Sequence, residues 1–252
     1  MIPSRLILKS AKPISGAAMT ERRLSVADLH SWYGESHILH GADFHVNRGE
    51  VVTLLGRNGA GKTTTMRALM GVARQRKGTA TLDGHDLLAT PPHRVARLGL
   101  GYVPEERGIF SSLSVAENLL LPPITRPGGM SIADIHDLFP NLKGRDRTIG
   151  TRLSGGEQQM LAIARILRTG ADFILLDEPT EGLAPVIVDD ISRALGTLKS
   201  MGLTIILVEQ NIRFATANAD RHYVMEQGRI VDEFTNDALM ADMSRIDAYL
   251  GV

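Results

Sequence analysis

Three short segments of the chain carry side chains and backbone groups suited to phosphate chemistry. Residues 56–63 read Gly-Arg-Asn-Gly-Ala-Gly-Lys-Thr, which fits a glycine-rich loop whose backbone N–H groups surround phosphates. Residues 153–160 contain a Ser-Gly-Gly turn before a helical pattern, and such a turn offers a hydroxyl and free N–H groups to an anion. Residues 173–178 form an apolar run that ends in Asp177 and Glu178. Two adjacent acids at a strand end suit a magnesium–phosphate centre.

The residue types at these positions predict separate roles. Lys62 is placed to reach the β- and γ-phosphates, and the N–H groups of residues 59–64 would surround them. The hydroxyl of Thr63 and the carboxylate of Asp177 are oxygen ligands of the kind that Mg²⁺ prefers. Glu178 would polarise an attacking water. The alternative for the two acids, a plain strand-end turn, is disfavoured by the phosphate loop upstream.

The elements that position these segments are predicted from the hydrophobic pattern. A continuous apolar strand at residues 50–55 feeds the glycine loop, and residues 62–70 form the helix after it. Strands alternate with helices, and two strands are nearly all apolar, so we expect a mostly parallel sheet covered on both faces. The remaining predictions are strands at 24–30, 38–40, 42–46, 79–82, 101–103, 172–177 and 204–209, helices at 92–98, 156–168 and 185–200, and a hairpin around 227–228.

Two parts of the chain depart from this α/β pattern. The short alternating segments near the start predict a small antiparallel sheet. From about residue 106 to residue 160 the pattern becomes helical, in segments 114–121 and 131–139 that are separated by Pro and Gly. We therefore expect a helical subdomain inserted in the α/β core. Residues 74–77 are rich in Arg and Lys, so we expect a solvated loop there.

Composition excludes several classes of function. The chain has 252 residues with 43% apolar content, enough to bury a large core. Its 28 basic and 28 acidic residues cancel, which argues against a broad nucleic-acid-binding face. Cysteine is absent, so disulfides and thiolate metal sites are excluded. No apolar run reaches the roughly 18–20 residues that span a bilayer, so we expect any membrane association to be peripheral.

The first residues and the histidines have separate interpretations. We expect residues 1–23 to be a disordered extension, because residues 1–18 have too little apolar content to repay the entropy of ordering. Their apolar run is also shorter than the about 7–15 residues of a secretory signal. A membrane-surface helix is the alternative. His37 and His40 lie three apart but have no neighbouring ligands in a metal-binding pattern, so we interpret them as exposed residues at a strand edge.

These segments together resemble the nucleotide-binding subunit of an ABC transporter, from about residue 24 to the C-terminus. The resemblance implies an ABC ATPase domain at 24–252, with a P-loop NTPase α/β core, an antiparallel β subdomain and the helical insertion. It implies ATP and Mg²⁺ as cofactors and ATP hydrolysis as the reaction. The nucleotide-binding residues that it implies are Tyr33, which would stack on adenine, and Gly56, Arg57, Asn58, Gly59, Ala60, Gly61, Lys62, Thr63, Thr64, Ser154, Gly155 and Gly156.

The resemblance also implies a dimer. Ser154 and the two glycines after it would face the nucleotide held by the other subunit, so that two ATP molecules lie at the interface. ATP would then hold the subunits together, and hydrolysis would weaken their interface. A Ser-Gly-Gly turn before a helix is by itself more often a plain N-cap. The Glu-Gln-Gln that follows Gly156 makes the resemblance specific.

Three positions depart from the common pattern of the family. Glu105 stands where the family usually has Gln, and the resemblance places it with Thr63 and Asp177 as a metal ligand. Ala184 stands where Asp is common. Gln210 stands where a His usually senses the γ-phosphate. An amide donates a hydrogen bond but cannot become a cation.

The departures resemble one branch of the family, the second ATP-binding subunit of branched-chain amino acid importers. In that branch Gln210 would act in catalysis beside Glu178 and Lys62. The segments that carry the resemblance are 103–105, 107–110, 153–160, 181–185 and 208–211. The partners implied are two transmembrane permease subunits, a sister ATP-binding subunit and a periplasmic or extracellular solute-binding protein. The ATP-binding subunits would form a heterodimer, or a homodimer of this chain in isolation. The chain would lie at the cytoplasmic face of the inner membrane, with no nucleic acid bound.

Other functions remain open from the sequence. The same ATPase could power transport of urea, short amides or lipopolysaccharide. A soluble ABC ATPase acting on ribosomes or DNA is disfavoured by the single cassette and the zero net charge. A nucleotide clamp that does not hydrolyse ATP is kept open by Gln210 and Ala184.

Overall fold

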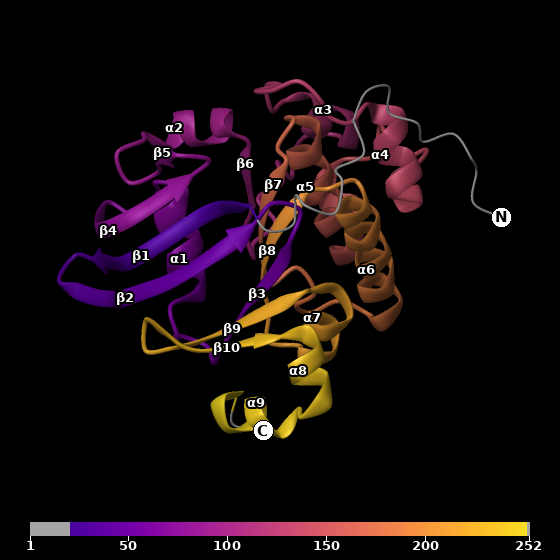
Figure 1. Ribbon diagram of the computed structural model, residues 1–252. Coiled ribbons are helices and arrows are strands. Elements are labelled where there is room, and N and C mark those ends of the chain that lie inside the picture. Colours follow the sequence, from indigo (N-terminus) through magenta and orange to yellow (C-terminus); the bar gives the residue numbers. More distant parts are fainter. Residues whose placement is uncertain (1–20, 251–252) are drawn as a thin grey trace.

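A six-stranded sheet with the order β10-β9-β3-β8-β7-β6 lies at the centre of the computed structural model, which describes residues 21–250 (Figure 1). Its strands are β3 (Val51–Leu55), β6 (Leu100–Val103), β7 (Phe173–Asp177), β8 (Thr204–Val208), β9 (Arg221–Glu226) and β10 (Arg229–Thr235). All pairs are parallel except β9 with β10. Every residue of β3, β7 and β8 is buried, as a parallel sheet covered on both faces requires. The predicted α/β fold is confirmed.

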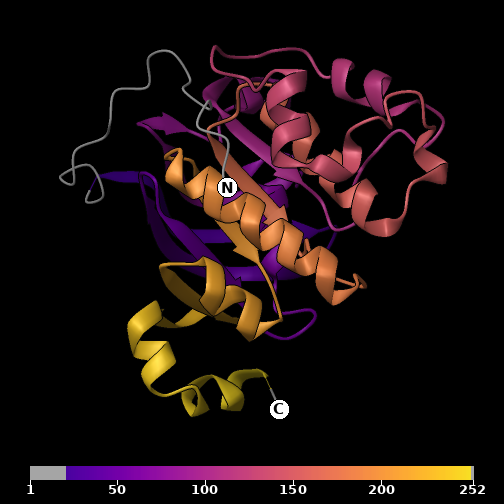
Figure 2. The same ribbon diagram turned by 90° about the vertical axis from the view of Figure 1, so that its right-hand side faces the viewer.

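Alternate residues of the strands point to two cores. Ile206 of β8 packs with the antiparallel sheet and α1 (Lys62–Leu69), whereas Ile205 packs on the other face with α5 (Gly155–Arg168) and α6 (Pro185–Ser200). Figure 2 shows α6 running along that second face. The smaller C-terminal helices are α7 (Ile212–Asn218), α8 (Asn236–Ala241) and α9 (Ser244–Leu250). Within residues 21–250, no helix is both long enough and apolar enough to cross a bilayer.

The antiparallel sheet has the order β2-β1-β4-β5, from β1 (Arg22–Tyr33), β2 (Ser36–Asn47), β4 (Gln75–Leu82) and β5 (His85–Asp86). The strand predicted from residue 24 begins two residues earlier, and residues 1–20 of the expected extension lie outside the described residues. The two strands predicted at 38–40 and 42–46 are one strand. Gly41, at φ +90°, lies within it, and irregular pairing with β1 accommodates the residue.

Two expectations about exposed residues near this sheet were wrong. Residues 75–77 are the start of β4 and not a loop, because their backbone pairs with β1 whatever their side chains. The half-buried Arg76 donates to the carbonyl oxygens of Ala68 at 2.8 Å and Leu88 at 3.0 Å. His37 and His40 do lie on the edge strand β2, but both are half-buried. Trp32 on β1 stacks over His37 with ring centroids 4.4 Å apart.

The helical segment lies at one corner of the molecule, away from the antiparallel sheet (Figure 1). It contains α3 (Val115–Leu120) and α4 (Ile132–Leu138), while the predicted helix at 92–98 is α2 (Pro92–Val95) followed by a 3₁₀ turn. Three helices, α3, α4 and α5, begin at a serine whose side chain accepts from the backbone three residues on, where an acid returns the bond. The boundaries of a helical subdomain at about 106–160 stay a prediction, and α5 continues past them to Arg168.

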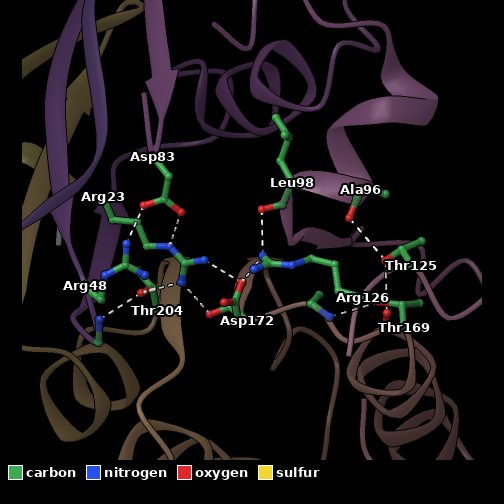
Figure 3. Close-up of polar contacts among 12 residues, drawn as sticks. Arg23, Arg48, Asp83, Ala96, Leu98, Thr125, Arg126, Thr169, Asp172 and Thr204 are labelled. Atoms are coloured by element: carbon green, nitrogen blue, oxygen red, sulfur yellow. Dashed lines mark hydrogen bonds and ion pairs between the residues drawn. The ribbon is translucent and has the colours of Figure 1, made fainter. Parts of the chain in front are cut away.

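A network of ion pairs connects three parts of the fold (Figure 3). Arg23 on β1 has a side chain only 2% exposed, and it donates to Asp172 at 2.5 Å and to the hydroxyl of Thr204 at 3.2 Å. Arg126, in the loop between α3 and α4, donates to the same carboxylate at 3.0 Å and to the carbonyl oxygen of Leu98 at 2.9 Å. Asp172 therefore joins the antiparallel sheet, the start of β7 and the helical segment.

Replacing Asp172 should destabilise the fold. The Asp172→Ala variant removes the carboxylate from two guanidinium groups, one of them buried, and we expect a loss of about 2 kcal/mol in the free energy of unfolding. Chemical denaturation of the purified chain measures this loss. The control is Asp189→Ala at an exposed position of α6. Equal stability of the two variants would show that the network contributes little.

Candidate nucleotide-binding site

The predicted site residues are gathered at one edge of the central sheet. Strands β3, β8, β7 and β6 are neighbours and run parallel, so their carboxyl ends open at the same edge. The segments that follow them are far apart in sequence, at 56–61, 209–211, 178–184 and 104–110. Topology alone therefore brings the phosphate loop beside the adjacent acids.

The loop after β3 has the backbone geometry of a phosphate cradle. At Gly56, φ is +153° and a Cβ would lie 2.2 Å from the carbonyl oxygen of Met225; at Gly61, φ is +112° and a Cβ would lie 2.9 Å from Leu39. Both positions thus require glycine. Gly61 leads directly into α1, whose N-terminus has no side-chain cap and no acid in its first turn. Its N–H groups are available to an anion.

The side chain of Lys62 lies inside this loop. It is 4% exposed, and its ammonium donates to the carbonyl oxygens of Gly56 at 2.7 Å and Arg57 at 3.2 Å. The same nitrogen lies 3.5 Å from a carboxylate oxygen of Glu178. The structure therefore brings the predicted lysine and the predicted base together.

Oxygen atoms suited to a divalent cation meet beside the loop. The hydroxyl of Thr63 donates to one oxygen of Asp177 at 3.1 Å, and the hydroxyl of Tyr102 donates to the other at 2.9 Å. Burial raises the pKa of Asp177, and the nearby charges of Glu178 and Glu105 raise it further, against the effect of the two hydroxyl donors. A cation would relieve this crowding of acids. The predicted ligands Thr63 and Asp177 fit Mg²⁺, which proteins often hold with one or two carboxylates plus substrate phosphates.

Glu105 lies near this centre without a direct contact. Its side chain is exposed, and its charge raises the pKa of Asp177. Among residues 21–250, no group of three His, Asp or Glu side chains converges to hold a metal by itself. Thr63 and Asp177 are therefore the best supported ligands, and a role for Glu105 stays a prediction.

Glu178 has a constrained backbone and a defined partner. Its φ is +46°, a region that non-glycine residues rarely adopt and that is found at functional sites. Its N–H donates to the carbonyl oxygen of Val208 at 2.9 Å. The side-chain amide of Gln210 donates to its carboxylate at 2.8 Å. The carboxylate thus lies between the amide of Gln210 and the ammonium of Lys62.

Tyr33 has an accessible ring near the loop. It ends β1 and is 45% exposed. The largest cause that raises the pKa of Arg67, on the helix after the phosphate loop, is a hydrogen bond that its guanidinium donates to the oxygen of Tyr33. Tyr33 is therefore available to stack on a base beside α1.

The Ser154 loop lies apart from the phosphate loop within one chain. Ser154 is exposed and caps α5, accepting from the N–H of Glu157 at 3.3 Å, which leaves the hydroxyl proton free to donate. Gly155 packs beside Arg107, and a Cβ on Gly156 would lie 2.5 Å from Ile187. No hydrogen bond or ion pair within the described part of the chain joins this loop to the phosphate loop. Ser154 therefore acts as an ordinary N-cap of α5, and its exposed hydroxyl could also donate to a group on a second subunit.

Three polar residues of the site received no role from the sequence, namely Tyr102, Thr180 and Glu209. Tyr102 contacts Asp177, and Glu209 accepts from Thr180 at 2.7 Å. Strand order supplies the missing signal. Tyr102 pairs with Leu175, and Asp177 follows two positions along, on the same face of the sheet. Val208 pairs with Asp177, so Glu209 must lie beside the residues after β7.

Relatives of known function match most of the chain. The chain is 40% identical over 231 residues to the high-affinity branched-chain amino acid transport ATP-binding protein BraG of Pseudomonas aeruginosa, covering 90% of this chain and 99% of the relative. It is 34% identical over 243 residues to the lipopolysaccharide export system ATP-binding protein LptB of Haemophilus influenzae, covering 90% and 97%.

Solved structures show the same fold. A nucleotide-free ATP-binding cassette from an ABC transporter superposes with a TM-score of 0.80 at 24% identity, over 92% of this chain and 99% of that one. An ATP-binding subunit of an ABC transporter gives 0.76 at 26% identity, over 91% and 100%. Residues 39–181 match the family described as ABC transporter. The chain therefore belongs to the ABC transporter family, as one of its nucleotide-binding, ATP-hydrolysing subunits.

Proposed function

We propose that this chain is the ATP-hydrolysing subunit of an importer for branched-chain amino acids. The observation that carries the proposal is the 40% identity to BraG, which extends over 99% of that protein. The segment Glu209-Gln210-Asn211, with an amide where the family usually has His, supports the same branch. The edge of the sheet supplies the chemistry that such a subunit needs.

The geometry supports separate roles for these residues in ATP hydrolysis. The N–H groups at the start of α1 and the ammonium of Lys62 bind and orient the β- and γ-phosphates. Thr63 and Asp177 would hold Mg²⁺, which neutralises charge on the phosphate oxygens when bound. Glu178 orients and polarises the attacking water. Its carboxylate lies 3.5 Å from the ammonium of Lys62 and is therefore close to the phosphates that Lys62 would bind.

A second subunit completes the site in this proposal. The exposed Ser154, with the N–H groups at the start of α5, would close over the γ-phosphate held by the partner. Two such sites would form in one dimer because the contact is reciprocal. Binding of ATP would then favour the dimer, and hydrolysis would release it.

The other proposed partners follow from import. They are two transmembrane permease subunits, a sister ATP-binding subunit and a solute-binding protein on the far side of the membrane. The chain itself would lie at the cytoplasmic face of the inner membrane. The solute never contacts this chain in such an assembly, so its identity must be tested on the complex.

Copurification followed by solute binding tests this proposal. The tagged chain is isolated in detergent from cells that express its own permease and binding-protein genes, and the recovered binding protein is titrated with leucine, isoleucine and valine. We expect micromolar or tighter binding of at least one of them, equivalent to about −8 kcal/mol or better. A binding protein that ignores all three and binds another solute would overturn the assignment.

The 34% identity to LptB favours a second candidate, ATP-driven export of lipopolysaccharide. The same copurification separates the two. An exporter complex would bring down permeases without a solute-binding protein, and lipopolysaccharide would stimulate its ATPase in proteoliposomes. Stimulation by loaded binding protein, and not by lipopolysaccharide, is the result expected here.

Gln210 should limit the rate of this chain. Its amide donates to Glu178 at 2.8 Å but cannot become a cation as charge develops on the phosphoryl oxygens. In the Gln210→His variant we expect ATP turnover of the purified chain to rise about tenfold, equivalent to about 1.4 kcal/mol of barrier. Steady-state phosphate release measures it. An unchanged or lower rate, with ATP affinity intact, would show that Gln210 only tunes the site.

A further inference from the structure

A buried carboxylate connects the two loops that hold Glu178 and Gln210. Glu209 directly follows β8 and is 3% exposed. One of its oxygens accepts from the hydroxyl of Thr180 at 2.7 Å. Thr180 is 8% exposed and lies two residues after Glu178. The bridge thus spans the loops after β7 and β8 behind the side chains proposed to act on ATP.

The second carboxylate oxygen fixes the turn after β8. It accepts from the backbone N–H groups of Gln210 at 3.2 Å and Asn211 at 3.3 Å. The N–H of Glu209 donates to the carbonyl oxygen of Leu54 at 3.3 Å, on the strand that leads to the phosphate loop. Asn211 in turn caps α7. Glu209 is therefore held in place from several sides, and it holds the backbone from which Gln210 extends.

This arrangement sets two side chains relative to each other. Gln210 donates to Glu178 at 2.8 Å, and this contact joins the same two loops that Glu209 and Thr180 bridge. Glu178 sits at φ +46°, a conformation that persists only where the surroundings enforce it. A shift of either loop would move the carboxylate of Glu178 away from Gln210. A misplacement of about 1 Å at a reacting centre costs up to about 100-fold in rate.

Burial of the Glu209 carboxylate costs free energy, and the need to fill the space does not explain why a carboxylate lies there. Burial raises the pKa of Glu209, and the charge of Glu178 raises it further. Filling the same space with an apolar side chain is often neutral or stabilising in proteins. The three accepted hydrogen bonds offset the cost, and they are the feature that an apolar side chain cannot supply.

We propose that Glu209 is a positioning residue for ATP hydrolysis, which fixes Glu178 and Gln210 by bridging Thr180 to the turn after β8. The inference rests on the proposed function of Glu178. Glu209 contacts no reacting atom and acts as a hydrogen-bond acceptor and not through its charge. Glutamine keeps that capacity, because its oxygen can accept from the two N–H groups while its amide donates to the Thr180 hydroxyl. Methionine has a similar length and lacks it.

Four variants of the full chain test this role. Glu209→Met removes the acceptors, Glu209→Gln keeps the hydrogen bonds without the charge, and Thr180→Val removes the hydroxyl at constant shape. Thr197→Val is the matched control, because it removes a hydroxyl that bonds only to the carbonyl oxygen of Arg193 on the exposed side of α6. Steady-state kinetics give kcat and KM for ATP, and the melting temperature and ATP affinity report folding.

We expect kcat to fall by about tenfold to 100-fold in Glu209→Met and by a smaller factor in Thr180→Val, with the KM for ATP within about twofold of wild type. Glu209→Gln should recover most of the loss, and the Glu209→Met/Thr180→Val double variant should fall no further than Glu209→Met. Wild-type kcat in Glu209→Met would overturn the role. So would equal loss in Glu209→Gln and Glu209→Met, which would assign the effect to charge.

Separate control variants distinguish a folding defect from a failure of the proposed function. If the Glu209→Met variant no longer binds ATP, the Thr180→Val variant provides the test. A wild-type kcat in Thr180→Val would then overturn the inference. Glu178→Gln is measured in parallel. If that variant loses turnover while Glu209→Met and Thr180→Val do not, only the positioning role fails. If Glu178→Gln keeps full turnover, the proposed function of Glu178 fails first.

Discussion

The Glu178→Gln variant should lose ATP turnover by roughly 10²–10⁴-fold, the range expected when a general base is removed. Glutamine keeps the shape of the side chain, and it can still pair with Gln210, which now donates to glutamate at 2.8 Å. It lacks the carboxylate that would polarise water. Because ATP would bind without being consumed, dimers should accumulate in ATP and Mg²⁺, and size-exclusion chromatography would detect them.

The control for this variant is Asp137→Asn, the same change of acid to amide at an exposed position of α4. It should keep the turnover and the monomer–dimer ratio of the wild type. Near-normal turnover in Glu178→Gln would overturn the catalytic assignment, whatever the state of the dimer.

The Lys62→Ala variant should lose nucleotide binding. The ammonium is the buried cation of the phosphate loop, whereas the loop's other cationic residue, Arg57, is exposed. We expect ATP affinity to fall by at least about 100-fold, equivalent to roughly 2.7 kcal/mol. Titration with a fluorescent ATP analogue measures the affinity.

Two further variants make this result specific. Lys77→Ala removes an exposed lysine on β4 and should leave the affinity unchanged. Lys62→Met fills the space of the stem without the charge, so it separates a collapsed loop from a lost cation. Affinity close to wild type in Lys62→Met would contradict the role of the ammonium.

Much of the fold could be predicted because its signals are local. A continuous apolar run with a loop and a helix after it identified β3 and α1, and the helix predicted at 185–200 matches α6 at Pro185–Ser200. Helical periodicity, separated by Pro and Gly, identified α3 and α4. These features depend on neighbours within a few residues.

The errors lie where the structure depends on pairing with another strand. Residues 75–77 pair with β1 through the backbone, and that pairing leaves no trace in their polar composition. Trp32 covers His37 from the neighbouring strand, so the exposure of His37 depends on register. The bulged pairing that lets β2 continue through Gly41 is likewise a property of two strands.

The candidate site divides in the same way. Lys62, Thr63 and Asp177 belong to motifs with fixed spacing, and the structure places them together. The contacts of Tyr102 and Glu209 require the order β8-β7-β6, which no single segment encodes. Contact of Ser154 with a nucleotide requires a second chain, and that contact stays a prediction.

The central claim is that each ATP is bound between two subunits, and in isolation the second subunit would be another copy of this chain. Mixing two inactive variants of the isolated chain tests this claim most directly. Lys62→Ala disables the phosphate loop of its own subunit. Ser154→Asp keeps the cap of α5, since Asp is also a good N-cap, but sets a negative charge against the partner's γ-phosphate. Each variant alone should be inactive, because every site in its dimer is damaged.

In an equal mixture, half of the dimers contain one copy of each variant, and one of their two sites is intact. We predict that the mixture regains about a quarter of the wild-type ATPase rate, as a reciprocal two-fold interface requires. A rate no higher than the average of the two variants alone would contradict a shared site.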